Sequence, residues 1–184
     1  MSTVIGVIGI PGTGKSTLMQ AFKDSYLWEE HKPVDLLDGY LARDEGIFLM
    51  GKYEEGEVFS GTDRLSMAVQ PEAVKYLQGK PAPTVIFEGD RLNSVSFFRE
   101  CLDAGHDLHI LILNVERSIR EQRYKDRGSD QSDKFIKGRK TKISNIRNEF
   151  GANLMDDGNI TKFDHETPED TAKILAHINS ILPK

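Results

Sequence analysis

Short apolar runs alternate with stretches of helical periodicity along this 184-residue chain. The clearest runs, 4–8 and 108–115, are rich in Val, Ile and Leu, which is typical of strands buried on both faces of a parallel sheet. Their alternation with helical segments predicts an α/β fold, with a five-stranded parallel sheet and helices on both faces. The predicted strands are 4–8, 33–37, 84–87, 108–115 and 160–163.

The helical segments carry start and stop signals. Thr167, Pro168 and Asp170 combine a cap, a proline in the first turn and a capping-box partner, which predicts a final helix to about Leu182. The segment 40–62 mixes glycines, acids and apolar residues, so we expect either a loop that covers a substrate or an ordinary loop with a short helix. Other helices are predicted over 18–22, 71–77, 95–102, from 116 to a break at Gly128, and over 134–148.

The first strand runs into a glycine-rich segment with a recognisable chemistry. Gly9-x-x-x-x-Gly14-Lys15-Ser16 has the spacing of a phosphate-binding loop and stands between a strand and a helix, as that motif requires. Glycines let successive N–H groups curl around a phosphate, and the helix N-terminus favours negative charge. Lys15 would bridge the β- and γ-phosphates of ATP, and the Ser16 hydroxyl would bind Mg²⁺. The predicted nucleotide-binding residues are Gly9, Pro11, Gly12, Thr13, Gly14, Lys15, Ser16 and Thr17.

Acidic residues follow two other predicted strands, at the sheet edge where ligands of such folds bind. Glu88 and Asp90 follow the strand 84–87, and either carboxylate would hold Mg²⁺, directly or through water. We place Glu88 at the metal and Asp90 in catalysis, while which of Asp38, Glu88 and Asp90 serves the metal and which the acceptor stays open. Arg91 is expected to clamp a substrate phosphate. Asp38 would orient the acceptor hydroxyl, although a turn or a helix cap accounts for this aspartate equally well.

Two polar residues are assigned to the substrate within a predicted substrate-binding insertion of about 39–82. Arg64 stands in the first turn of a predicted helix, where a cation opposes the helix dipole, so we expect this arginine to bind an anion. Gln70 would read a base edge through its amide.

Basic residues cluster in one late segment. Eleven Lys or Arg and four acids between Arg117 and Arg147 give a net charge of +7, within a chain whose net charge is −5. Arg123 and Arg127 lie one helical turn apart and are predicted to act in catalysis on the same triphosphate, from a helix–break–helix lid of about 117–148. A solvated helical face is the plainer interpretation of such a run, but the phosphate loop favours a polyanion site.

Composition narrows the class of protein. Hydrophobic content of 38% and charged content of 29% are typical of a globular chain, and we expect one domain over 1–184. No apolar run reaches the ~20 residues that span a bilayer, and the first run leads directly into the phosphate loop, so we interpret it as a core strand and not as a signal peptide. Cys101 is the sole cysteine, which excludes an intrachain disulfide and favours the cytoplasm, or the host cytoplasm if the chain is viral. The oligomeric state, a homodimer included, stays open.

In their order along the chain, these motifs resemble those of the P-loop nucleotide kinases, and the resemblance covers essentially the whole chain. It implies a P-loop NTPase-type three-layer sandwich with a helical lid, and ATP and Mg²⁺ as cofactors. Asp90-Arg91 resembles the acid–arginine pair of thymidylate and deoxynucleoside kinases, although Leu92 replaces the tyrosine that usually follows in thymidylate kinases. The segment 62–66 is similar to small kinases of tailed bacteriophages, some of which phosphorylate 5-hydroxymethyluracil within DNA.

The resemblance implies a phosphotransferase, and the lack of a long apolar run predicts that it has no membrane partner. Its acceptor would be a deoxynucleoside monophosphate or the hydroxymethyl group of 5-hydroxymethyluracil in phage DNA. Two alternatives stay open: a kinase of a metabolite or an antibiotic built on the same core, and a nucleotide switch without a phosphoryl acceptor. The arginine-rich lid argues against a switch, because switches generally leave the transition-state arginine to a partner or to one special loop.

Overall fold

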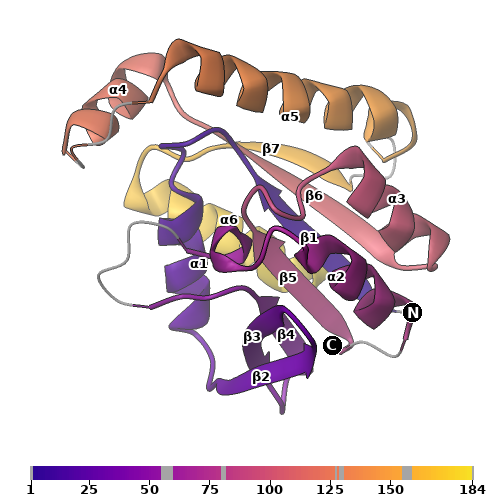
Figure 1. Cartoon of the computed structure of the whole chain (residues 1–184). Coiled ribbons are helices and arrows are strands. Elements are labelled where there is room, and N and C mark those ends of the chain that lie inside the picture. The colour runs from indigo at the N-terminus through magenta and orange to yellow at the C-terminus, as the bar shows by residue number, and fades with distance from the viewer. Residues whose placement is uncertain are drawn as a thin grey trace.

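The computed structural model describes residues 2–54, 60–79, 82–126, 128, 131–154 and 159–183, apart from the side chains of 152–154. The described chain contains a seven-stranded sheet in the order β2-β3-β4-β5-β1-β6-β7 (Figure 1). Its strands are β1 Thr3–Ile8, β2 Glu29–Val34, β3 Leu37–Ala42, β4 Ile47–Met50, β5 Thr84–Glu88, β6 Asp107–Asn114 and β7 Ile160–Asp164. Its helices are α1 Lys15–Lys23, α2 Val69–Gln78, α3 Val95–Asp103, α4 Arg117–Asp126, α5 Asp133–Leu154 and α6 Pro168–Ile181, with a 3-10 turn at Thr62–Arg64.

Five neighbouring strands, β4, β5, β1, β6 and β7, run parallel. β1 lies between β5 and β6, with Val4 opposite Val85 on one side and Leu108 on the other. The predicted strands that became β1, β5, β6 and β7 are confirmed, and so is the α/β class. Because these strands are parallel, their carboxyl ends meet at one edge of the sheet, where a ligand can reach several of them at once.

The segment 29–50 differs from its prediction. It forms three strands, where we predicted one strand over 33–37 followed by irregular chain over 40–62. β2 and β3 pair antiparallel, as do β3 and β4, and β4 then joins the parallel set beside β5. β2 is a polar edge strand, so no apolar run indicated it, and β4 is only four residues long. The sheet therefore has seven strands and not five.

The central strand separates two apolar layers, because successive side chains of a strand point to opposite faces. Val4 and Ile8 belong to the cluster that α2, α3 and α5 cover, whereas Ile5 and Val7 belong to the cluster that α1 and α6 cover. The three layers of helix, sheet and helix that the sequence predicted are confirmed. The helices supply Leu18, Met19, Phe22, Val69, Ala73, Leu77, Phe97, Phe98, Ile146, Phe150, Ile174 and Ile178 to these layers.

The late helices begin and end close to their predicted positions. Thr167 and Asp170 form the predicted capping box at the start of α6, with Asp170 N donating to Thr167 Oγ1 (3.2 Å) and Thr167 N donating to the Asp170 carboxylate (3.0 Å). The predicted break between two basic helices separates α4 from α5. The later part of α5 is anchored, because Arg99 Nε of α3 donates to Glu149 Oε1 (2.9 Å). None of the described helices is long and apolar enough to cross a membrane.

Candidate active site

The phosphate-binding loop lies between the end of β1 and the start of α1. Gly12 and Gly14 have φ of +81° and +83°, and Gly14 is the N-cap of α1. Residues with a side chain rarely adopt such angles. Left-handed residues among ordinary ones turn neighbouring backbone N–H groups toward one side, which creates a nest for an anion. α1 adds the partial positive charge of its N-terminus, so the loop suits a phosphate group.

The carbonyl groups of this loop are all hydrogen-bonded within the protein. Their donors come from the loop itself, from α1, from α4 and from the segment before α6. The bonds are Lys15 Nζ to Gly9 O (2.7 Å), Thr13 Oγ1 to Ile10 O (2.8 Å), Tyr124 OH to Pro11 O (2.5 Å), Arg123 Nη1 to Gly12 O (2.9 Å), His165 Nδ1 to Thr13 O (2.8 Å) and Leu18 N to Gly14 O (2.9 Å). These bonds hold the loop in the shape that offers its N–H groups to a ligand.

His165 joins the loop to the last helix. A carbonyl oxygen only accepts, so Nδ1 must carry the proton that is donated to Thr13 O. Nε2 is hydrogen-bonded to the Thr171 hydroxyl of α6 (2.8 Å). Both nitrogens of the buried ring therefore have a partner. The sequence analysis did not single out His165, because its role depends on a contact across 152 residues of chain.

Arg123 does not line the cavity beside the loop, where we expected it to meet a triphosphate. Its guanidinium donates to three carbonyls: Gly12 O (2.9 Å), His165 O (3.2 Å) and Glu166 O (3.2 Å). The helical spacing predicted a face of cations that meets a triphosphate, but the guanidinium of Arg123 meets carbonyl groups of the protein instead. The structure therefore places Arg123 as a brace of the loop. Its predicted partner Arg127 lies outside the described residues.

One cavity of about 520 Å³ brings the phosphate loop together with residues from β5, α5 and the segments around them. Eight predicted residues line this cavity, among them Lys15, Ser16, Glu88, Asp90 and Arg91. Of the remaining predicted loop residues, Pro11, Gly12 and Gly14 line it as well. Thr13 turns its hydroxyl to Ile10 O, Gly9 is not among the lining residues, and Thr17 is exposed. The other lining residues are Ser60, Asp63, Tyr124, Gln131, Phe135 and Arg139.

Glu88 ends β5 and lies buried beside the loop. Ser60 Oγ donates to Glu88 Oε1 (3.0 Å) and is also hydrogen-bonded to Ser16 Oγ (2.7 Å), so three oxygen groups meet at this point. Burial raises the pKa of Glu88 to about 7, and the nearby Lys15 opposes part of that rise. Hydroxyl and carboxylate oxygens are the donors that Mg²⁺ prefers, so the set fits that ion. The sequence analysis missed Ser60, because only the fold brings it to β5.

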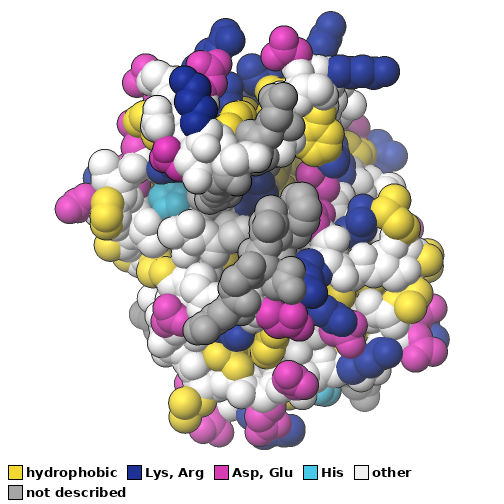
Figure 2. All heavy atoms as spheres, turned by 60° about the vertical axis from the view of Figure 1, so that its left-hand side comes forward, with side chains coloured by type: hydrophobic (Ala, Val, Ile, Leu, Met, Phe, Trp, Pro, Cys, Tyr) yellow, Lys and Arg dark blue, Asp and Glu magenta, His cyan; other side chains and the backbone are white. Residues whose placement is uncertain are grey.

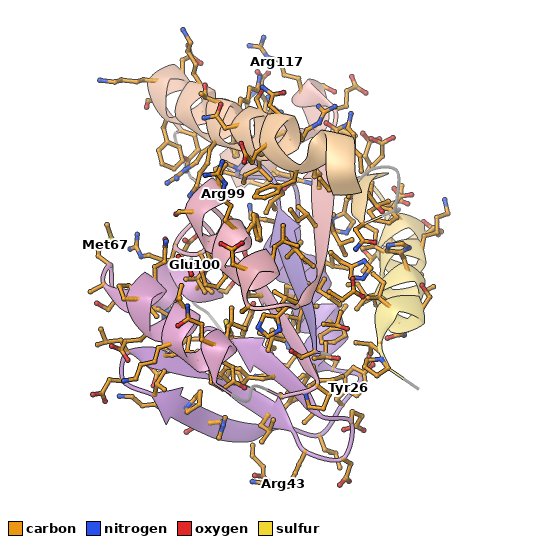
Figure 3. The ribbon with its side chains drawn as sticks, turned by 90° about the vertical axis from the view of Figure 1, so that its right-hand side faces the viewer. Tyr26, Arg43, Met67, Arg99, Glu100 and Arg117 are labelled. Carbon is orange, nitrogen blue, oxygen red and sulfur yellow. The ribbon has the colours of Figure 1, made fainter. Side chains whose placement is uncertain are left out.

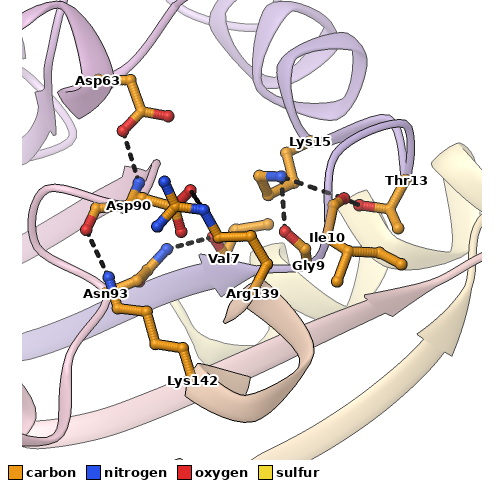
Figure 4. Close-up of polar contacts among 10 residues, drawn as sticks. All are labelled: Val7, Gly9, Ile10, Thr13, Lys15, Asp63, Asp90, Asn93, Arg139 and Lys142. Carbon is orange, nitrogen blue, oxygen red and sulfur yellow. Dashed lines mark hydrogen bonds and ion pairs between the residues drawn. The ribbon is translucent and has the colours of Figure 1, made fainter. Parts of the chain in front are cut away.

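Asp90 is held by groups from two other elements (Figure 4). Asp90 N donates to Asp63 Oδ1 (2.7 Å), and Arg139 Nε of α5 forms an ion pair with Asp90 Oδ2 (3.0 Å). Lys142 Nζ donates to the Asp90 carbonyl (2.7 Å). Burial, and then the charge of Asp90, raise the pKa of Asp63. No local pattern in the sequence indicated that Asp63, Arg139 or Lys142 contacts Asp90.

Three other predicted site residues do not line this cavity. Asp38 lies inside β3, at the same edge of the sheet, and forms an ion pair with Lys52 (3.4 Å) beside a separate cavity. The predicted strand end at Asp38 is therefore wrong. Arg64 pairs with Glu54 (2.8 Å). Gln70 Nε2 donates to Ser96 Oγ (3.0 Å) at the start of α3.

Solved structures share this fold. The chain is similar to a gluconokinase from Sinorhizobium meliloti 1021, with 16% identity and a TM-score of 0.50 over 97% of this chain and 94% of that one. It is similar to a deoxyadenosine kinase from M. mycoides with bound dCTP, with 13% identity and a TM-score of 0.50 over 97% and 100% of the two chains. At such identities the likeness concerns the fold alone. No curated protein matches the chain in sequence.

A family model agrees with the loop, the sheet and the cavity described above. The family is described as P-loop Nucleotide Kinase3, and its model matches residues 1–180. The match spans nearly the whole chain, including the phosphate loop, β5 with its acidic end and both basic helices. The chain therefore belongs to the P-loop nucleotide kinase3 family and is a phosphotransferase of the kinase type.

Proposed function

We propose that the protein transfers the γ-phosphate of ATP, with Mg²⁺, to a deoxynucleotide-type acceptor. The acceptor is the hydroxymethyl group of 5-hydroxymethyluracil in DNA or a deoxynucleoside monophosphate. One observation carries the proposal: the phosphate loop lines the same cavity of about 520 Å³ as Asp63, Asp90 and Arg91. A phosphoryl donor on the loop thus faces a carboxylate and a guanidinium across one cavity. The description of the family as nucleotide kinases supports a nucleotide-type acceptor.

The donor side of the cavity supplies positive charge. The N–H groups of the loop and the Lys15 ammonium stabilise charge on the transferred phosphoryl group. Mg²⁺, when bound, would neutralise the β- and γ-phosphates, and Ser16, Ser60 and Glu88 are the residues that would hold it. Among the described residues, no cluster of three or more His, Cys, Asp or Glu side chains is built to hold a metal. Phosphate oxygens of ATP and water would complete the coordination shell of the ion.

The acceptor side supplies a base. The acceptor oxygen attacks the γ-phosphorus, the bond to the bridging oxygen breaks, ADP leaves, and the hydroxyl proton passes to a carboxylate. We assign this carboxylate to Asp63, since Asp90 is paired with Arg139 and Asp38 lies outside the cavity. Burial raises the pKa of Asp63, which brings the carboxylate closer to the basicity that a general base requires.

An aromatic and a guanidinium group fit a nucleobase. Phe135 and Arg139, one turn apart on α5, both line the cavity, with the Arg139 guanidinium carbon 4.6 Å from the centre of the Phe135 ring. Phe135 is 39% exposed, so part of its ring is free to stack on a flat base. A base within a duplex would have to leave the stack to reach this position.

An acceptor panel tests the proposal. The protein is incubated with Mg-ATP and, separately, with each deoxynucleoside monophosphate, a single-stranded oligonucleotide with one 5-hydroxymethyluracil, its thymine counterpart, gluconate, or no acceptor. ADP release and the mass of the acceptor are measured. Lys15→Ala should abolish transfer while the fold is kept, and Lys173→Ala is the matched control, because its side chain is 74% exposed on α6.

The pattern of ADP release decides among the acceptors. Phosphorylation of the hydroxymethyluracil oligonucleotide alone identifies a DNA-directed kinase, and stimulation by one monophosphate identifies a nucleotide kinase. Transfer only to gluconate would contradict the proposal in favour of a metabolite kinase. Slow ADP release that ignores every acceptor would contradict it in favour of a nucleotide switch.

A further inference from the structure

A second cavity, of about 460 Å³, lies between α4 and α5. We call it the α4–α5 groove. Among the described residues, five cations and two acids line it. One of the two acids already pairs with a cation, since Arg117 Nε donates to Glu121 Oε1 (2.6 Å). The groove thus has an excess of positive charge, which favours a polyanionic ligand. Its lining residues are Arg117, Arg120, Glu121, Tyr124, Lys125, Gln131, Asp133, Ile136, Lys137 and Lys140.

Arg120 is the buried cation of the α4–α5 groove. Only 8% of this residue is exposed, and its Nε has no hydrogen-bond partner among the described residues. A buried guanidinium whose Nε–H is unsatisfied costs free energy, and an anion bound close to that N–H would reduce the cost. The same side chain also packs against the phosphate loop, because a Cβ added to Gly12 would come 2.7 Å from Arg120 Cγ. The groove is therefore built next to the phosphate loop, and its cations outnumber its acids.

The α4–α5 groove adjoins the candidate active site. Tyr124 and Gln131 line both cavities. α5 turns Lys137 and Lys140 toward the groove and Phe135 and Arg139 toward the active-site cavity. A chain of phosphates in the groove would therefore lie beside whatever occupies the active-site cavity. Figure 2 shows Lys and Arg side chains gathered at the upper end of the molecule, where α4 and α5 lie.

We propose that the α4–α5 groove binds the phosphodiester backbone of a single-stranded polynucleotide whose target base enters the active-site cavity. The proposal rests on the proposed function and selects its polymeric acceptor. Exposed lysines and arginines that lie along the backbone of a nucleic acid give affinity without sequence preference. The aromatic ring on which the target base would stack, that of Phe135, lies in the adjoining active-site cavity. A free monophosphate would need only the active-site cavity, so the groove has a use only when the acceptor continues beyond one nucleotide.

The test measures strand binding without ATP. A labelled single-stranded oligonucleotide of about 15 nucleotides is titrated with protein at about 50 mM and about 200 mM salt, and anisotropy gives the Kd. The variant Lys137→Ala/Lys140→Ala removes two exposed cations of the groove. The matched control Arg43→Ala/Lys75→Ala removes two exposed cations that line neither the groove nor the active-site cavity; Arg43 lies at the far end of the molecule from Arg117 (Figure 3).

We expect the groove variant to bind the strand at least about tenfold more weakly at low salt, and the control to change less than about twofold. The slope of log K against log salt should fall by about 1.4, since each lost phosphate contact removes about 0.7 for a single strand. Equal Kd values for the two variants would overturn the proposal, and so would a wild-type protein that does not bind the strand.

A second readout separates this proposal from the proposed function. The Kd of Mg-ATP, measured by calorimetry, should be the same in the groove variant and the wild type. If Mg-ATP binding weakens by the same factor as strand binding, the groove belongs to the nucleotide site and the proposal is wrong. If the groove variant loses strand binding although the wild type transfers no phosphate to any acceptor, strand binding by the groove is supported and the proposed function is wrong.

Discussion

Replacing Arg123 tests whether this arginine braces the phosphate loop or contacts a phosphate. Arg123→Ala removes one donated hydrogen bond from each of three carbonyls, those of Gly12, His165 and Glu166. A hydrogen bond from a charged group contributes about 1.5–3 kcal/mol, but the side chain is half-buried and water can replace part of the loss. We therefore expect the free energy of unfolding to fall by about 2–4 kcal/mol.

The melting temperature reports this loss. For a chain of this size, 1 kcal/mol corresponds to about 2–4 °C, so the melting temperature should fall by about 4–16 °C. The Kd of Mg-ATP should rise about tenfold if the loosened loop costs about 1.4 kcal/mol to reorder. Arg117→Ala is the control on the same helix, because Arg117 is largely exposed and bonded only to Glu121 in the described structure; its melting temperature should hardly change.

The opposite outcome would refute the reasoning. If Arg123→Ala melts at the wild-type temperature and binds Mg-ATP normally while transfer is lost, Arg123 acts on the phosphoryl group and not on the loop. The original sequence interpretation would then be restored.

Three further predictions concern the carboxylates of the site. Burial raises the pKa of Glu88 from 4.5 to about 7, so the contribution of this group to stability is full below pH 4.5 and is lost as the pH rises through 7. The difference in melting temperature between the wild type and Glu88→Gln should therefore fall between pH 5 and 8. A constant difference would contradict this prediction. Gly61→Ala would place a Cβ 2.5 Å from Glu88 Oε1, whereas a Cβ at Gly105, where φ is similarly positive, would meet no atom within 4 Å. In denaturant titrations Gly61→Ala should therefore lose about 1–3 kcal/mol more stability than Gly105→Ala. Equal losses would exclude the contact as the cause. Asp63→Asn keeps an oxygen for Asp90 N but removes the base, so kcat should fall about 10²–10⁴-fold, whereas an unchanged kcat would assign the base elsewhere.

The sequence predicted those parts of the fold that local pattern determines. Continuous apolar runs identified β1, β5, β6 and β7, because strands buried on both faces need no alternation. The hairpin of β2 and β3 was missed for the opposite reason: its edge strand is polar, and the glycine at 39 resembles a turn although it lies inside β3. The tight approach of Gly39 to Leu49 O, 2.4 Å from an added Cβ, explains why a glycine stands there.

The candidate site was predictable where residues follow a motif or a strand end. Lys15, Ser16, Glu88, Asp90 and Arg91 all line the cavity because parallel strands end at one edge of the sheet. Residues placed by long-range packing were not predictable. Ser60 reaches β5 from 28 residues away, and α5 brings Arg139 to Asp90 from 49 residues away.

The sequence also could not predict which part of the protein or ligand a given helix face contacts. Spacing showed that Arg123 shares a face with other cations, but it could not show whether that face meets phosphates or the carbonyls of the protein. Asp38 is a similar case among the strands. It lies at the predicted edge of the sheet, but inside β3 and not after the end of the predicted strand.

Calorimetric titration of the folded protein with Mg-ATP tests the central claim most directly, namely that the glycine loop binds a nucleoside triphosphate for transfer of its terminal phosphate. We predict saturable binding to the wild type and at least tenfold weaker binding to Lys15→Ala, about 1.4 kcal/mol, with Lys15→Ala shown to be folded by circular dichroism before nucleotide is added. An absence of binding to well-folded wild type, or equal binding to both proteins, would contradict the account.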